Sequence, residues 1–183
     1  VVIAAVPWYA LTNLFLSGPP APLAEILASA EATESSPIVT VNLWLDRPVL
    51  DVPFLGLPGR QMQWLFDKGQ LFGDTASHLS LVSSGSAAMI GLSNRTVVQQ
   101  ATENIREALP AARFATVGRA TVVRETRATF SLAPGQPLRP STETGLPGFL
   151  LAGDWIDTGL PATIESAVLS GHRAAEAALK FGS

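Results

Sequence analysis

The sequence contains no cysteine, one tyrosine and two histidines, and charged residues make up only 15% of its 183 positions. Without cysteine the chain can form neither a disulfide framework nor a thiolate metal site, and such a composition fits a reducing compartment such as the cytoplasm. No His, Asp and Glu residues have the spacing of metal ligands, so we predict no bound metal. His78 and His172 are expected to be structural or solvated.

Basic residues are too few and too scattered for a nucleic-acid-binding surface. The chain carries 12 Lys and Arg against 15 Asp and Glu, a net charge of −3, whereas nucleic-acid binding needs clustered positive charge. A long hydrophobic run is also missing, because the most apolar stretch, residues 1–16, is interrupted by Pro7 and Asn13. It is too short to cross a bilayer. We predict no nucleic-acid partner and no membrane-spanning segment.

Apolar residues are abundant for a soluble chain of this size. They make up 47% of the sequence, and the mean hydropathy is +0.29. A chain of this length can bury one core or two small lobes. The apolar excess predicts either surface that is covered by further protein or an exposed apolar face that meets lipid or substrate.

Hydrophobic periodicity and turn residues predict a mixture of strands and helices. A helix should follow Ser93 as its N-cap and end near residue 109, before Pro110. Residues 32–37 are predicted to be a polar break, residues 67–74 a connection between strands, and residues 133–148 an irregular loop. Strands are predicted at 1–6, 38–45, 61–66, 78–83, 115–126 and 149–152, and further helices at about 22–30 and from 164 onward.

Residues 149–175 are the most informative segment. A predicted buried strand ends at Gly153 and Asp154, and a helix with apolar residues at helical spacing begins near Ile164. Free N–H groups and partial positive charge at the start of a helix favour an electron-rich ligand atom. The Asp154 carboxylate could accept hydrogen bonds from sugar or polyol hydroxyls. The alternative is an ordinary strand-turn-helix in which Asp and Thr side chains merely cap the helix.

The sequence of this segment resembles the C-terminal flavin-contacting motif of the amine oxidase and carotenoid (phytoene) desaturase superfamily. The matching residues are GDWIDTGLPATIESAVLSG at 153–171. The segment is most similar to the squalene-associated FAD-dependent desaturases, or hydroxysqualene dehydroxylases, of hopanoid biosynthesis. The resemblance implies that Asp154 holds the ribityl or pyrophosphate part of FAD. It also implies a cofactor-binding set of Gly153, Asp154, Trp155, Pro161, Ala162, Thr163 and Ile164, in which the backbone at 162–164 meets the pyrimidine edge of the flavin. The family usually has Gly where this chain has Ser166.

The resemblance extends more weakly over most of the chain, through residues 1–7, 36–49, 61–68 and 116–130. It implies an α+β fold made of two lobes. Residues 1–37 and 126–183 would be C-terminal parts of an α/β FAD-binding lobe, and residues 38–125 a substrate lobe with an antiparallel sheet and a helix. An FAD enzyme of this class also needs a G-x-G-x-x-G motif, which this chain lacks. We therefore expect a fragment of a longer protein, whose N-terminal half is its missing partner.

The family implies reductive dehydroxylation of hydroxysqualene to squalene, by a cytoplasmic enzyme that touches the inner membrane to collect a long isoprenoid. Trp44, Trp64 and Phe66 would then line the substrate tunnel, or else simply pack within the sheet. No catalytic acid can be named from the sequence. Two alternatives remain open: a carotenoid desaturase or amine oxidase, and a truncated lobe without activity. The amine oxidase is poorly supported, because it needs an aromatic pair facing the flavin and the chain has one Tyr.

The absence of the G-x-G-x-x-G motif generates a prediction about the isolated chain. The pyrophosphate and adenosine would have no binding site, so most of the binding free energy for FAD should be lost. We expect these 183 residues alone to bind no FAD at micromolar concentration and to have no activity, measured by fluorescence titration. Tight flavin binding by this chain alone would contradict the expectation.

Overall fold

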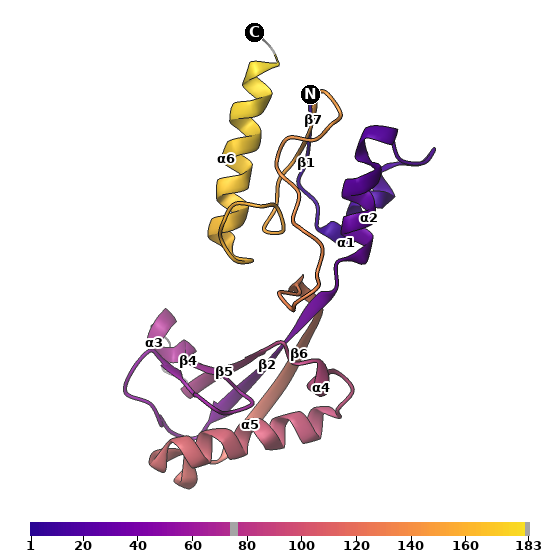
Figure 1. Ribbon diagram of the computed structural model, residues 1–183. Helices are drawn as coiled ribbons and strands as arrows, with labels where there is room; N and C mark the ends of the chain where they lie inside the picture. The colour runs from indigo at the N-terminus through magenta and orange to yellow at the C-terminus, as the bar shows by residue number, and fades with distance from the viewer. Residues whose placement is uncertain (74–76, 182–183) are drawn as a thin grey trace. The chain divides into compact units, whose positions relative to one another are not determined.

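The computed structural model describes residues 1–73 and 77–181 and contains both helix and sheet, as the predicted α+β class requires (Figure 1). The chain divides into two compact units: Val1–Ser35 with Thr129–Ser183, and Ser36–Ala128. The sequence predicted lobe boundaries between residues 37 and 38 and between residues 125 and 126, whereas the units of the structure meet between residues 35 and 36 and between residues 128 and 129. Among the described residues, no helix is long and apolar enough to cross a membrane.

A five-stranded sheet forms the larger part of the second unit. Its strand order is β3-β4-β5-β2-β6, and β2 with β5, β5 with β4, and β4 with β3 pair antiparallel. Four of the five strands overlap predicted strands. The three-residue β3 was missed because it is short, follows Pro53 and ends at Gly56. The strands are β2 (Ser35–Leu45), β3 (Phe54–Gly56), β4 (Trp64–Asp67), β5 (Ser77–Ser84) and β6 (Val117–Phe130).

Hydrogen bonds near the ends of β2 and β6 show that these strands run antiparallel. The Asp46 N–H donates to Thr116 O at 3.1 Å, and the Ser131 N–H donates to Glu34 O at 2.8 Å. The Asp46 carboxylate also accepts from the Thr116 N–H at 2.9 Å. Hydrogen bonds from Arg47 and then from Thr116 lower the pKa of Asp46 below its ordinary value, because both stabilise the charged form.

Helix α5 (Asn94–Ala108) packs on one face of this sheet. It begins as predicted, with the Ser93 side chain accepting a hydrogen bond from the Thr96 N–H at 3.1 Å, and it ends before Pro110. Because successive strand residues point to opposite faces, every second residue of β2 enters the core beneath α5. The buried residues from these two elements are Val39, Val41, Leu43, Val97, Ala101 and Ile105.

The opposite face of the sheet carries polar and aromatic side chains. His78 Nε2 lies 3.1 Å from Asn42 Oδ1, and the His78 ring stacks on Trp44 with centroids 4.2 Å apart. Farther along the same sheet, Phe66 lies with its ring centroid 6.5 Å from Trp64 and 6.3 Å from Phe54. The Trp64 and Phe54 side chains are 46% and 54% exposed, so a large part of this aromatic surface is open.

The connections of this unit contain short helices that the sequence analysis missed. Residues 67–74 were predicted as a plain connection, but Asp67 caps α3 (Lys68–Phe72) by accepting from the Gln70 N–H; Asp74 lies outside the described residues. The predicted polar break at 32–37 is shorter than expected, since β2 already begins at Ser35. The other helical turns are α4 (Ala87–Ile90) and η3 (Pro110–Phe114).

The first unit is built around two parallel strands, β1 (Val2–Ala4) and β7 (Phe149–Leu151). Helix α6 (Ile164–Lys180) lies alongside β7 (Figure 1). Residues 133–148 contain no helix or strand, as predicted, although Thr142 O accepts a hydrogen bond from the Leu151 N–H at 2.9 Å. The remaining helices are α1 (Trp8–Leu11), η1 (Thr12–Leu14), η2 (Ala21–Leu23) and α2 (Ala24–Ala32).

The buried face of α6 is not the most apolar one. The stripe of apolar residues that begins at Ile164 and Val168 was noted in the sequence, yet these two side chains are 86% and 51% exposed. The structure instead buries small side chains, because only a small residue lets the helix backbone approach β7 closely. The buried positions are Ser166, Ser170, Ala174 and Ala177.

Gly153, which follows β7 closely, has a backbone conformation that favours glycine. Its φ is +144°, and a Cβ atom there would lie 3.0 Å from Trp155 Cδ1. We expect Gly153→Ala to lower the free energy of unfolding by about 1–3 kcal/mol. Gly171→Ala is the matched control, because this helical position has nothing within 4 Å of an added Cβ. This substitution should raise the free energy of unfolding by about 0.5–1 kcal/mol. Denaturant unfolding measures both, and equal stability of wild type and Gly153→Ala would refute the assignment.

Candidate functional site

The loop at residues 153–163 connects β7 to α6 and has no regular secondary structure. It begins just beyond the carboxyl end of β7, which pairs in parallel with β1. In open sheets of parallel strands, ligands bind at this end of the strands. All seven residues predicted to contact the cofactor lie in this loop or at the first residue of α6.

Asp154 and Trp155 are neighbours in the chain but have different environments. The Asp154 side chain is half-buried, and no residue in 1–73 or 77–181 donates a hydrogen bond to its carboxylate or pairs with it. Trp155 is buried in the hydrophobic core of this unit, and its Nε1–H donates to Val6 O at 2.9 Å. The indole therefore anchors the loop, whereas the carboxylate next to it remains available to a ligand.

The start of α6 presents unpaired donors at the surface. Thr163 caps the helix by accepting a hydrogen bond from the Ser166 N–H at 3.2 Å. Pro161, Thr163 and Ile164 are exposed. The N–H groups of Ile164 and Glu165 have no acceptor among the described residues. With the partial positive charge of a 17-residue helix, this end suits an electron-rich atom of a ligand.

The alternative in which Asp and Thr side chains merely cap the helix holds for Thr163 but not for Asp154. Thr163 is a cap, but Asp154 is not, because its carboxylate accepts no N–H from the described part of the chain. An acceptor without a partner and a helix start with free donors are chemically matched to polyol hydroxyls and to the carbonyl edge of a heterocycle. The acceptor on the loop and the donors at the start of α6 thus fit the ribityl chain and the ring edge of a flavin.

Several residues that hold the loop were missed by the sequence analysis. Ser166, Ser170 and Arg173 lie three or four positions apart, so they share one face of α6, and this spacing was a readable signal. Arg139 also binds the loop, through Ile156 O and Leu160 O. It comes from the irregular 133–148 segment, where no periodicity exists to indicate a direction.

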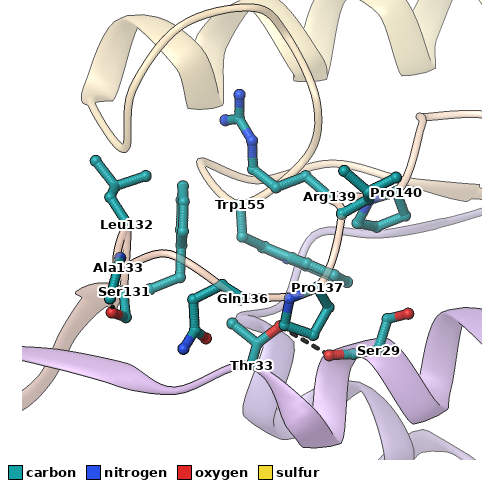
Figure 2. A pocket seen from close by; sticks show the side chains of 12 residues that line it. Ser29, Thr33, Ser131, Leu132, Ala133, Gln136, Pro137, Arg139, Pro140 and Trp155 are labelled. Carbon is teal, nitrogen blue, oxygen red and sulfur yellow. Dashed lines mark hydrogen bonds between the residues drawn. The ribbon is translucent and has the colours of Figure 1, made fainter.

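A pocket of about 220 Å³ lies beside this loop in the same unit. Figure 2 shows the Trp155 indole and the Arg139 side chain in its wall, together with Ser29, Thr33 and part of the 131–140 segment. Of the seven predicted cofactor residues, only Trp155 lines it. The predicted contact surface is therefore the open start of α6, and not this pocket.

The model of the family described as flavin containing amine oxidoreductase matches residues 1–179. A hydroxysqualene dehydroxylase from Sinorhizobium fredii is 36% identical over 174 residues, which are 91% of this chain and 38% of that protein. A probable zeta-carotene desaturase from Synechococcus elongatus is 29% identical over 116 residues, 63% of this chain and 23% of that protein. This chain thus spans less than two-fifths of the length of the curated relatives described here.

Solved structures share the fold. An oxidoreductase from Methanosarcina mazei superposes with a TM-score of 0.70 over 96% of this chain and 42% of that chain, at 18% identity. At this identity the likeness concerns the fold alone. The match over residues 1–179, together with the S. fredii relative, shows that this chain belongs to the flavin containing amine oxidoreductase family.

Proposed function

We propose that this chain is the C-terminal part of an FAD-dependent oxidoreductase that converts hydroxysqualene to squalene. The observation that carries the proposal is loop 153–163, with its unpaired Asp154 carboxylate and free helix donors, in a chain that is 36% identical to a hydroxysqualene dehydroxylase. The alignment also supports the proposal that this chain is part of a longer protein, because it covers only 38% of that relative. The exposed apolar side chains of Ile164 and Val168 are surface that further protein would cover.

The proposed cofactor contacts follow from the environment of each residue. Asp154 would hold the ribityl or pyrophosphate part of FAD, since its carboxylate is free to accept hydrogen bonds. The backbone of Ala162, Thr163 and Ile164 would meet the pyrimidine edge of the flavin. Gly153, Trp155 and Pro161 would shape the loop around these contacts.

The proposed reaction replaces a hydroxyl group by hydrogen at an allylic carbon. A reduced flavin, when bound, supplies the hydride that this replacement needs. The C–O bond breaks, and the departing hydroxide takes up a proton to form water. In this chain the start of α6 stabilises negative charge on ligand atoms placed against it, because its N–H dipoles are fixed before the ligand arrives.

The open face of the five-stranded sheet is the proposed wall of the substrate site. Phe54, Trp64 and Phe66 give it a continuous aromatic area, and burying hydrocarbon on such a surface contributes roughly 25 cal/mol per Å². The polar Asn42–His78 pair lies on the same face. A long isoprenoid with one hydroxyl group would match this mixture better than a small amine. Such a substrate dissolves in the lipid bilayer, so we propose that the enzyme collects it at the inner membrane surface, from the cytoplasm.

A carotenoid-desaturase-like activity is the second candidate, and the likeness to the Synechococcus elongatus relative favours it. An amine oxidase would want an aromatic pair facing the flavin. The one tyrosine of the chain, Tyr9, lies in α1 and outside loop 153–163. The third possibility, a truncated lobe with no activity of its own, is separated from the others by whether the longer protein is yellow with bound flavin.

We predict that Asp154→Ala weakens FAD binding by about 1–3 kcal/mol in the full-length protein, the usual loss for a charge-assisted hydrogen bond. FAD content after dialysis and the Kd from fluorescence titration measure the change. Asp51→Ala is the control, because Asp51 is an exposed aspartate that lies in the other unit. A purely structural Asp154 would instead give a lower Tm with unchanged FAD affinity.

We predict that the full-length protein with reduced flavin forms squalene from hydroxysqualene, and that phytoene and simple amines react more slowly or not at all. Product analysis by gas chromatography under anaerobic conditions measures this, with oxidised flavin as the control for the source of the hydride. Amine oxidation without squalene formation would exclude the proposed substrate. Desaturation of phytoene without squalene formation would promote the second candidate.

A further inference from the structure

Four side chains from outside loop 153–163 bind six of its backbone carbonyls, although the loop has no helix or strand. Three of these side chains come from one face of α6, and the fourth comes from the 133–148 segment. Their pairs are Ser170 with Gly153 O (2.9 Å), Ser166 with Asp154 O (3.3 Å), Arg173 with Asp157 O (3.1 Å) and Thr158 O (3.5 Å), and Arg139 with Ile156 O (3.4 Å) and Leu160 O (2.7 Å).

Ser166 and Thr158 form the most buried of these contacts. Ser166 is fully buried, Thr158 is 8% exposed, and their hydroxyl oxygens are 2.7 Å apart. Thr158 Oγ1 also accepts from the Leu160 N–H at 3.3 Å. One direction of donation satisfies every atom: Leu160 N–H to Thr158, Thr158 O–H to Ser166, and Ser166 O–H to Asp154 O. The relay connects Asp154 and Leu160 of the loop to Ser166 in the first turn of α6.

The two arginines hold the loop from different elements. Arg139 lies with its guanidinium 5.4 Å from the centroid of the Phe130 ring and pairs with the Asp157 carboxylate at 3.4 Å. Its Nη1 group donates to both Ile156 O and Leu160 O, while Nη2 donates to the Asp157 carboxylate, so one planar side chain holds three points of the loop. Arg173 binds the same stretch of backbone from α6. The loop therefore has few conformations left to lose.

These side chains occupy six of the loop's carbonyls, whereas the Asp154 carboxylate and the N–H groups of Ile164 and Glu165 have no partner among the described residues. An ordered loop binds a ligand more tightly than a disordered one, since the entropy of ordering has already been lost on folding. We infer that Thr158, Ser166, Arg139 and Arg173 are positioning residues, which order loop 153–163 before FAD binds. They thereby set the affinity of the protein for FAD and the reduction potential of the bound flavin. This inference rests on the proposed function.

The test is Thr158→Val in the full-length flavoprotein, a substitution of nearly equal volume that removes the hydroxyl. We expect the Kd for FAD to rise about tenfold, as for one lost buried hydrogen bond, with a shifted flavin reduction potential. Thr158→Ser should restore both values. Thr102→Val is the matched control, because that hydroxyl bonds only Val98 O within α5. A structural role alone would lower the Tm of Thr158→Val and leave the FAD Kd and potential unchanged, which would overturn the inference.

Two further variants test the relay and protect the test against misfolding. Adding Ser166→Ala to Thr158→Val should weaken FAD binding less than Thr158→Val itself does, because the Thr158–Ser166 bond is already lost and only the Ser166–Asp154 bond remains to be removed; a second loss as large as the first would overturn the relay. Arg173→Met changes an exposed residue and should raise the Kd severalfold, with the exposed Arg113→Met as control. A wild-type protein that retains no FAD would overturn the proposed function and this inference together. FAD retention with an unchanged Kd in all three variants would overturn the inference alone.

Discussion

The close packing of α6 on β7 is the contact on which the candidate site depends. It requires small side chains at the interface, and Ser166, Ser170, Ala174 and Ala177 meet that requirement. The two serines fill little space, yet their hydroxyls reach the backbone of the loop that precedes the helix. The packing surface and the hydrogen bonds to the loop are therefore one structural feature. A larger residue at either serine would separate the helix from β7 and release the loop.

The second unit separates its two roles by the two faces of one sheet. α5 covers the first face with a stripe of buried residues, and this core makes the sheet stable. The second face is thereby free to carry partly exposed aromatic and polar side chains. Strand alternation makes this division possible, because neighbouring residues on one strand point to opposite sides. An apolar ligand surface can then exist without disturbing the core.

Local patterns predicted most of the elements, because those elements depend on neighbours in the sequence. Alternation located β2 and β5, and Ser93 with Pro110 located both ends of α5. The errors occurred where tertiary contacts outweigh the local pattern. The Gln70 side chain of α3 donates hydrogen bonds to Leu50 O and Val52 O, about 20 positions earlier in the chain, and α6 buries its small residues instead of the larger apolar ones. Hydrophobicity ranks side chains by transfer free energy, but it carries no information on how closely two backbones must approach.

The sequence by itself determined the family and the position of the loop, since GDWIDTGLPATIE is a contiguous motif with its own turn residues. It also determined that Thr163 could begin the helix. Only the tertiary structure decided which groups of the loop are free. The Trp155 indole is bound by Val6, 149 positions away, and Leu160 O by Arg139, 21 positions away. Such partners meet only after the chain has folded, and no local pattern encodes them. The availability of the Asp154 carboxylate therefore follows from contacts that the sequence does not display.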